Sequence, residues 1–137
     1  MIRSFKVELP AFKRGYHLIT NYVESALESL PQTGIVNLFL QHTSAAITLN
    51  ENVDPDVRYD FETIMNRIVP ENQKGLRHTL EGSDDMPAHL KASLIGQSLT
   101  IPVVNGRLAT GTWQGIYLCE FRNNGTSRKL LITLYGE

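Results

Sequence analysis

The stretch IVNLFLQHTSAAITLN, residues 35–50, decides the fold of this chain. Its first part, residues 35–41, is too apolar for a surface loop, and TSAAITLN starts at residue 43 after a very short interval. Short apolar runs of this kind are typical of strands inside a protein. We therefore predict two neighbouring buried strands, with His42 at the junction between them.

His42 is the least easily explained residue of this stretch. If the alternation of the first strand is continued, His42 falls on the face that carries Val36, Leu38 and Leu40. An imidazole on such a face needs a polar partner. A metal ion or a hydrogen bond in the core would each provide one.

The clearest local signal follows these strands, at Asp54-Pro55. An Asp at the N-cap accepts a hydrogen bond from a free helix amide, and a Pro at the first helical position removes another free amide. The apolar residues beyond it recur along one helical face: Val57, Phe61, Ile64, Met65 and Ile68. This pattern predicts a helix that begins here and ends before Pro70.

A shorter helix is predicted before the central stretch. Apolar residues recur with helical spacing from Val23 to Leu30. Asn21 is the predicted N-cap, and Glu24 would reach back to it as in a capping box. This helix is expected to stop before Pro31.

A third helix is predicted to begin at Asp84 or Asp85 and to run through Leu94. The residues expected to face inward are Met86, Leu90 and Leu94. A second face is expected to carry His89 with the small residues Ala92, Ser93 and Gly96. The preceding polar stretch, residues 70–85, contains His78 and has no regular period, and such a connection is usually functional or mobile.

The remaining segments have β character. Residues 2–9 alternate with a period of two, and Pro10 ends that strand. Three more strands are predicted in the last part of the chain, separated by turns at Asn105-Gly106 and Asn124-Gly125, with the sequences SLTIPVV, QGIYLCEFR and RKLLITLY. Together with the helices, they predict an α+β fold: one domain, residues 1–137, with a two-layered, sandwich-like β core and about three helices.

Composition restricts the function. A chain of 137 residues has the length of one domain, and a formal net charge of −1 argues against a nucleic-acid partner. The sequence has no apolar run long enough to cross a membrane, and its N-terminus has no apolar core of a signal peptide. The single Cys119 cannot form an internal disulfide, and we expect it to be buried and inert. We expect a cytoplasmic protein that binds neither nucleic acid nor membrane.

Three histidines, His42, His78 and His89, lie in segments rich in polar residues. Three imidazoles with an open position form a common catalytic zinc site. Their spacing matches no short zinc motif, so the residues alone favour the alternative that each is a polar loop residue or a capped, hydrogen-bonded core residue. His17, in an apolar strand-like stretch beside Tyr16, is expected to be structural.

Carboxylates form a second group of candidates. Glu51 and Asp54 flank the turn between the second buried strand and the long helix, where catalytic groups are often placed. The capping role explains Asp54, whereas Glu51 is the preferred acid, base or metal ligand. Glu120 would be buried in a late strand, with Arg122 and Arg128 as candidate partners.

The segment Thr110-Gly-Thr-Trp-Gln-Gly115 is a weaker candidate. Its glycines and donors could hold an anion through backbone amides. The alternative is a bulge or turn with Trp113 packed into the core.

Three longer segments resemble the YjbQ-like family, whose members are often described as secondary thiamine-phosphate synthases. These are QHTSAAITLNENVDPDV (41–57), RHTLEGSDDMPAHLKASLIGQSLTIPV (77–103) and GRLATGTWQGIYLCEFR (106–122). The resemblance covers most of the chain, and one difference is Ser44 in place of the second Thr found in many members. It implies a β-sandwich-like α+β fold that assembles as a homotrimer.

The resemblance also implies site residues. His42, His78 and His89 would form one set of metal ligands, with zinc as the expected metal and Mg²⁺ as the alternative for a diphosphate substrate. The cleft around them would be formed by Thr43, Ser44, Asn50, Glu51 and Asp54, of which Thr43, Ser44 and Glu51 are the candidate catalytic residues. A second, substrate-binding wall would be formed by Gly111, Thr112, Trp113 and Gln114.

Two functions follow as hypotheses. The first is a metal-dependent enzyme that acts on a small phosphorylated molecule, with thiamine-phosphate synthesis as a side reaction that releases pyrophosphate. The second is a non-catalytic trimer that binds a metal or a small ligand. A purely structural interaction protein would leave the polar residues between His42 and Asp54 without a role.

Overall fold

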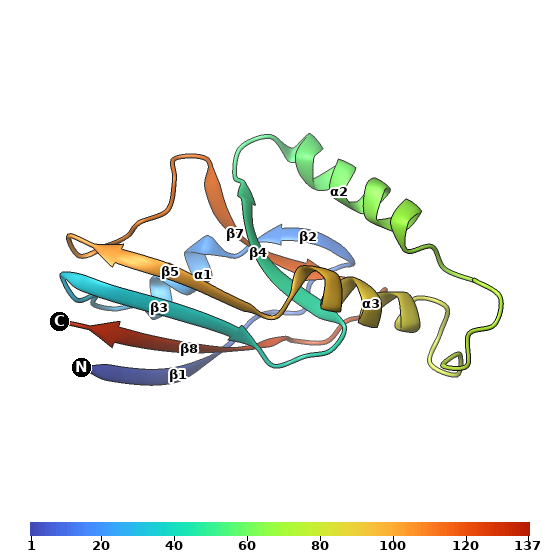
Figure 1. Cartoon of the computed structure of the whole chain (residues 1–137), viewed down its shortest axis with the longest axis horizontal. Coiled ribbons are helices and arrows are strands. Elements are labelled where there is room, and N and C mark those ends of the chain that lie inside the picture. Colours follow the sequence, from blue (N-terminus) through green and yellow to red (C-terminus); the bar gives the residue numbers. More distant parts are fainter.

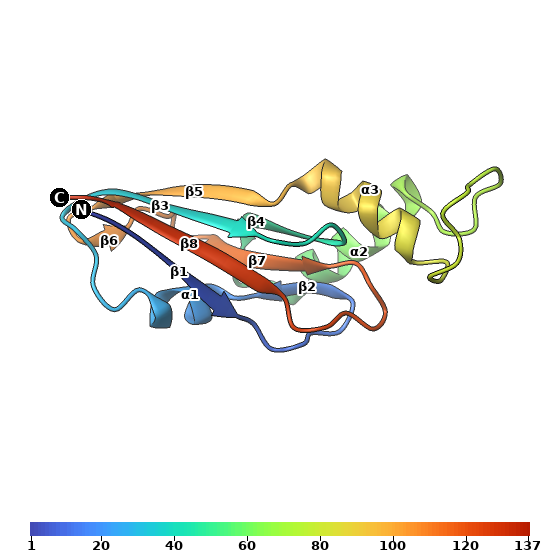
Figure 2. The same cartoon turned by 90° about the horizontal axis from the view of Figure 1, so that it is seen from below.

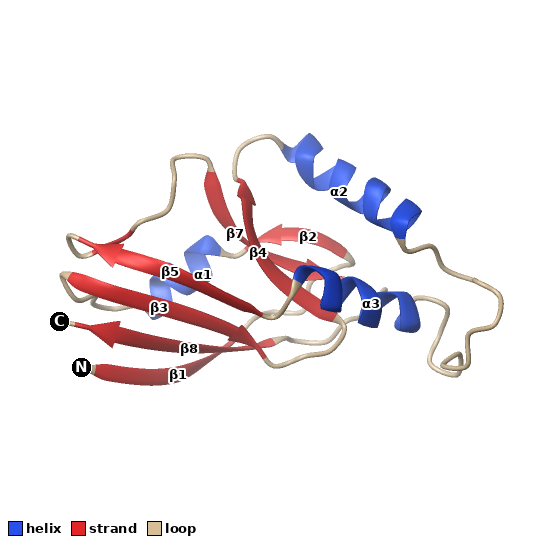
Figure 3. Cartoon of the chain, viewed as in Figure 1, coloured by secondary structure: helices blue, strands red, loops and turns tan.

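Two antiparallel sheets and three helices make up the protein in a computed structural model that describes all residues, 1–137 (Figures 1 and 3). The larger sheet has the order β1-β8-β3-β5-β6, with bounds Ile2–Glu8, Lys129–Gly136, Thr33–Leu40, Ser98–Val104 and Arg107–Leu108. The smaller sheet has the order β2-β7-β4, with bounds Gly15–Leu18, Gln114–Glu120 and Ala45–Glu51. The helices are α1 (Thr20–Ala26), α2 (Pro55–Ile68) and α3 (Asp85–Ile95). The α+β fold predicted from the sequence is confirmed.

The main core lies between the two sheets. It joins alternate side chains of β3, β5 and β8 with those of β4 and β7, and α1 contributes Val23. The core members from the larger sheet are Val36, Leu38, Leu40, Ile101, Val103, Leu130, Ile132 and Leu134. The smaller sheet contributes Ala45, Ile47, Ile116 and Leu118. The alternation of these residues along each strand thus fixes which face of each sheet lies inside.

The central strands differ from their prediction in one respect. Both exist, but β3 pairs with β5 and β8 while β4 pairs with β7, so they belong to different sheets and are not hydrogen-bonded neighbours. The chain changes layer between Leu40 and Ala45, where His42 lies. In addition, β3 is buried on one face only, because Ile35 and Phe39 are exposed on the other.

Helix α1 departs from the predicted capping box. It begins at Thr20 with Ile19 as N-cap, and no side chain caps it. The Thr20 hydroxyl instead accepts a hydrogen bond from the Ile116 amide, at 2.9 Å, and so ties the start of the helix to β7. The helix also ends at Ala26, well before Pro31. The predicted N-cap at Asn21 was therefore wrong because a contact with a distant strand sets the start of the helix.

Helix α2 begins as predicted, but its apolar face is less buried than expected. Asp54 caps it through a hydrogen bond from the Asp56 amide to Oδ1 (2.9 Å), and Pro55 is its first residue. None of its residues is fully buried, and Ile64 and Ile68 of the predicted stripe are exposed. Phe61 does pack inward, against the ring of Tyr16.

Polar contacts also hold α2. The Arg14 guanidinium donates hydrogen bonds to the side chains of Glu62 and Asn66 on the helix, and to Glu71 just beyond it. Lys91 from α3, which is fully buried, donates to the same Asn66 oxygen at 2.7 Å. Burial and the nearby Arg14 lower the pKa of Lys91. This network connects α2 and α3 with Arg14, the residue that precedes β2.

The buried face of helix α3 differs from the one predicted from the sequence pattern. Its buried residues include Ala88, Lys91 and Ala92, whereas Leu90 and Leu94 are exposed. The helix packs on β4, and small alanine side chains allow the two backbones to approach closely. The prediction that the large leucines face inward was therefore wrong.

The helices leave one broad surface open. Helices α2 and α3 pack on strands of the smaller sheet, and α1 packs on β7, so the outer face of the larger sheet has no helix over it (Figure 2). Exposed apolar side chains on this face include Ile2, Ile35, Phe39, Val104 and Tyr135. None of the helices is long and apolar enough to cross a membrane.

Candidate metal centre

Two of the predicted histidines meet at an acidic residue that sequence reasoning missed. Asp85 is the first residue of α3, His89 lies one turn later on the same helix, and His78 comes from the preceding loop. The Asp85 Oδ2 atom lies 2.5 Å from His78 Nε2 and 3.2 Å from His89 Nε2. One potential ligand atom from each residue lies within 4.8 Å of the other two. The i, i+4 spacing of Asp85 and His89 is the signal in the sequence that could have identified Asp85.

The contacts of His89 restrict what can lie between these residues. His89 Nδ1 lies 2.9 Å from the backbone carbonyl of Thr43, and only a protonated Nδ1 can donate to it. In the neutral ring, Nε2 then presents a lone pair to the Asp85 carboxylate. Two electron-rich atoms in such proximity need a proton or a cation between them. A carbonyl that orients a histidine in this way is a common feature of metal sites.

Arg122 holds the other side of Asp85. Its guanidinium donates to Asp85 Oδ1 and, through Nε, to Asp84 Oδ2 at 2.9 Å. Burial would raise the pKa of Asp85, but the hydrogen bond from His78 and the positive charge of Arg122 outweigh it, so the pKa is lowered. Asp85 is therefore an ionised, oriented carboxylate with one oxygen facing both histidines. Two imidazoles and a carboxylate are a donor set that suits Zn²⁺, so these residues fit the metal implied by the family resemblance.

His42 lies near this cluster but faces other partners. Its Nε2 accepts a hydrogen bond from the backbone amide of Lys129, at 2.8 Å, and its Nδ1 lies 3.3 Å from the Arg128 guanidinium. Partial burial and the charge of Arg128 lower the pKa of His42, so the ring is neutral at neutral pH. The structure thus brings His78 and His89 together with Asp85, and leaves His42 outside this group.

His42 and His89 line the same pocket, together with mostly polar residues. It has a volume of about 480 Å³, and its lining residues are Phe39, Leu40, Gln41, His42, Thr43, His89, Ser93 and Gln97. The Thr43 and Ser93 side chains make no hydrogen bond within the chain, which leaves two hydroxyls free beside His89. The pocket is large enough for a small ligand next to the candidate metal centre.

Ser44 contacts a buried ion pair formed by Arg128 and Glu120. Arg128 donates to both oxygens of Glu120, at 2.7 and 2.5 Å, and to the Ser44 hydroxyl at 3.0 Å. Of the two predicted partners, Arg128 is therefore the one that neutralises Glu120, whereas Arg122 reaches it only through its backbone amide. A side chain at Gly125 would collide with the Glu120 carboxylate, so the loop can cover this pair only with glycine there.

The remaining predicted residues gather at the other end of β4. That strand begins at Ala45, next to the histidine cluster, and ends at Glu51. At a rise of about 3.3 Å per residue, its two ends are roughly 20 Å apart. At the far end Asn50 accepts from the Glu51 amide, Glu51 accepts from the Val53 amide and Asp54 caps α2. Within one chain, these residues do not face the histidines.

The segment from Gly111 to Gln114 lies at this same far end. Gln114 pairs with Glu51 across the strands, and its side chain accepts from the Gly111 amide at 2.8 Å. The Thr112 carbonyl accepts a hydrogen bond from Asn52. Trp113 is 63% exposed, so the alternative that placed it in the core was wrong. Its exposure leaves a large aromatic surface free beside Glu51.

The expected burial of Cys119 is confirmed, and His17 has contacts of the kind expected of a structural residue. Cys119 is buried, and burial raises the pKa of its thiol, as expected of an inert residue. His17 stacks on Phe12 and its Nε2 lies 2.6 Å from the Lys13 carbonyl, so it has a structural role.

Comparisons with known proteins agree with this fold. The family model described as "UPF0047 protein YjbQ-like" matches residues 5–137. The chain is 50% identical over 131 residues to the UPF0047 protein YjbQ of Escherichia coli O157:H7, with 94% of each chain covered. It is 38% identical to a UPF0047 protein of Methanocaldococcus jannaschii, with 97% of this chain and 94% of that protein covered. The crystal structure of a conserved hypothetical protein from Thermus thermophilus superposes with a TM-score of 0.84 and 36% identity, covering 96% of this chain and 99% of that one.

Proposed function

The chain belongs to the YjbQ-like UPF0047 family, and we propose that it is a metal-dependent enzyme acting on a small phosphorylated molecule. The observation that carries this proposal is the arrangement of His78 and His89 around one oxygen of the ionised Asp85. The Thr43 carbonyl and Arg122 orient two of these residues from outside. Such preorganisation is typical of metal sites rather than of surface ion pairs.

His78, Asp85 and His89 would hold the metal, with Zn²⁺ as the first expectation and Mg²⁺ as the alternative for a diphosphate substrate. A divalent metal in this position supplies a Lewis acid that stabilises negative charge on a phosphoryl oxygen or on a leaving group. The half-buried Arg122 keeps Asp85 ionised and in place. The hydroxyls of Thr43 and Ser93 are available to orient a ligand in the adjacent pocket.

Free cations on the loop that carries His78 support a phosphorylated substrate. Lys74 and Arg77 lie on the same loop, are exposed and take part in no ion pair. By contrast, Arg122 and Arg128 are bound to carboxylates. The specific reaction we propose, as a secondary activity, is the joining of a pyrimidine diphosphate to a thiazole phosphate, in which the diphosphate leaves as pyrophosphate.

We also propose that the protein is a cytoplasmic homotrimer. The uncovered face of the larger sheet, with Phe39 and Tyr135 exposed, supports an association between copies of the chain. In a trimer, the second group of polar residues, near Glu51 and Trp113, could form a site together with a neighbouring chain. The free, buried thiol of Cys119 suits a reducing compartment.

The test is turnover by metal-replete protein on the thiamine-phosphate precursors and on a panel of phosphate esters. Asp85→Asn is expected to abolish any activity, because it removes the shared anionic ligand. The matched control is Asp56→Asn, which removes an acid from the exposed first turn of α2. Tight binding of metal without turnover on any substrate would favour the alternative, a non-catalytic binding protein. Equal activity in the parent and in Asp85→Asn would contradict the proposal.

A further inference from the structure

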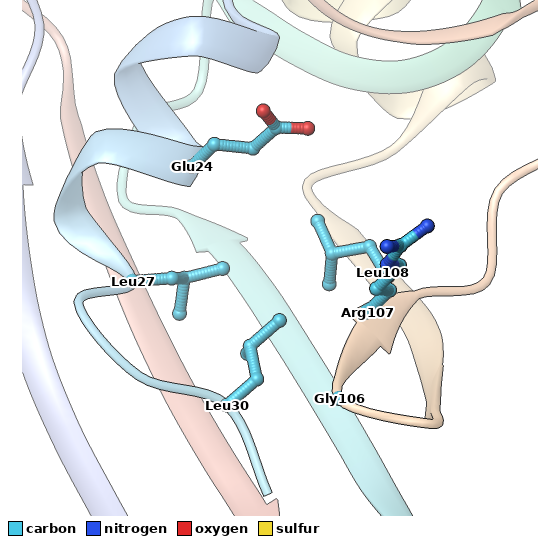
Figure 4. A pocket seen from close by; sticks show the side chains of 6 residues that line it. All are labelled: Glu24, Leu27, Leu30, Gly106, Arg107 and Leu108. Carbon is cyan, nitrogen blue, oxygen red and sulfur yellow. The ribbon is translucent and has the colours of Figure 1, made fainter. Parts of the chain in front are cut away.

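A second pocket lies between α1 and the β5–β6 hairpin, at the end of the molecule opposite α3 (Figures 1 and 4). Its volume is about 360 Å³, within the range of small-molecule sites. Its lining residues are Glu24, Leu27, Leu30, Gly106, Arg107 and Leu108. None of them contributes to the candidate metal centre, so the pocket calls for a separate explanation.

The floor of this pocket is apolar and packs against the main core. Leu27 belongs to the main core, and Leu30 and Leu108 pack against it from opposite sides of the pocket. Side chains fixed by a close-packed core offer a preformed surface, so an apolar group can bind without ordering the pocket first.

The position of the hairpin wall is also fixed. Asn105 and Gly106 both have positive φ, 52° and 74°, as a tight two-residue hairpin turn requires. The Gly106 amide donates a hydrogen bond to the Gln32 carbonyl, at 3.2 Å. Because Gln32 follows Leu30 closely in the chain, this bond ties the two walls together. The distance across the pocket is thereby set by the fold.

The two walls carry opposite charges that have no partner within the chain. Glu24 projects from α1 and Arg107 from the hairpin (Figure 4). Neither side chain takes part in an ion pair, with the other or with any residue. An apolar floor between a free carboxylate and a free guanidinium is complementary to a ligand with an aliphatic body, an ammonium group and a carboxylate.

We propose that this pocket binds a free α-amino acid with an aliphatic side chain. Glu24 accepts hydrogen bonds from its ammonium group, and Arg107 binds its carboxylate through two parallel N–H donors. The side chain rests on Leu27, Leu30 and Leu108. Such a site is independent of the metal centre and would make the protein responsive to a small metabolite.

The test is an NMR titration of the ¹⁵N-labelled protein with L-leucine. We expect saturable shifts confined to residues around Leu27, Leu30 and Leu108, with a dissociation constant below about 1 mM. Leucinamide lacks the carboxylate, 4-methylvalerate lacks the ammonium group and glycine lacks the side chain. Each is expected to bind at least about tenfold more weakly, because each loses one of the three contacts.

Substitutions in the pocket test which residue makes each contact with the ligand. Glu24→Gln should weaken leucine and leave 4-methylvalerate unchanged, whereas Arg107→Gln should weaken leucine and leave leucinamide unchanged. Glu28→Gln and Lys6→Gln, which lie outside the lining, are the matched controls. Absence of saturable shifts with leucine, equal binding of leucine and glycine, or unchanged leucine affinity in both pocket variants would overturn the proposal. The shifts should persist in the presence of EDTA, which separates this site from the metal centre.

Discussion

At the scale of single residues, the structure is distinguished by charges that are buried and already paired. Glu120 is fully buried, and Arg128 binds both of its oxygens. Removing one partner of such a pair leaves the other charge uncompensated in a medium of low dielectric constant. Sequence reasoning identified Glu120 and two candidate arginines, but the choice between them depends on tertiary contacts, since Arg122 pairs with Asp84 and Asp85 instead.

The first prediction concerns this pair. Glu120→Gln keeps the shape of the side chain, removes its charge and leaves Arg128 buried without a counterion. We expect the free energy of unfolding to fall by about 3–5 kcal/mol. Urea denaturation measures this change, with Glu8→Gln as an exposed control expected to stay within about 0.5 kcal/mol of the parent. A similar small change in both variants would show that the pair does not contribute to stability.

The second prediction concerns pH. The lowered pKa of His42 means that the folded state resists protonation of this ring, whereas the unfolded chain binds a proton near its ordinary pKa of about 6.5. Stability must therefore decrease as the pH falls below that value. We expect His42→Gln to lose this part of the pH dependence between about pH 7 and pH 5. Parallel slopes of unfolding free energy against pH in parent and variant would contradict a lowered pKa.

At the scale of elements, local signals gave correct results where contacts within the element decide the outcome. The start of α2 followed from Asp54-Pro55 because the cap is made by the adjacent amide of Asp56. The start of α1 could not be predicted, since it depends on a bond from Ile116 in β7. The inner face of α3 was missed because close approach to β4 favours alanine over leucine there.

The third prediction tests this corrected face of α3. Ala92 is fully buried, and a larger side chain has no room between the helix and β4. Ala92→Leu should destabilise the protein by about 1–3 kcal/mol. Leu94→Ala, on the exposed side of the same helix, should change stability by less than about 0.5 kcal/mol. Thermal or urea unfolding measures both changes. A larger loss of stability in Leu94→Ala than in Ala92→Leu would instead support the inner face first predicted from the sequence.

At the scale of the whole molecule, the candidate site is divided. The histidine cluster and the group around Glu51 lie at opposite ends of β4, although the family resemblance placed them in one cleft. Sequence spacing could not reveal this separation, because residues 42–54 are close along the chain but span an extended strand. In the proposed trimer, the residues around Glu51 would contact a neighbouring chain.

The fourth prediction concerns assembly. Sedimentation velocity should show the parent as a trimer at micromolar concentration. Phe39→Asp places a charge on the uncovered face of the larger sheet and should shift the protein toward monomer. Lys13→Asp, away from that face, is the control. A parent that sediments as a monomer would remove the proposed trimer.

The most direct test of the central claim is the zinc content and affinity of the purified protein, measured by elemental analysis and calorimetry. The parent is expected to bind one zinc ion per chain. Asp85→Asn and His89→Ala, with their folds verified by circular dichroism, are expected to lose it, whereas His17→Gln is expected to bind as the parent does. His42→Gln should also retain zinc, because the Lys129 amide already occupies its Nε2. A parent that binds no divalent metal, or zinc affinity unchanged by Asp85→Asn, would contradict a metal centre at His78, Asp85 and His89.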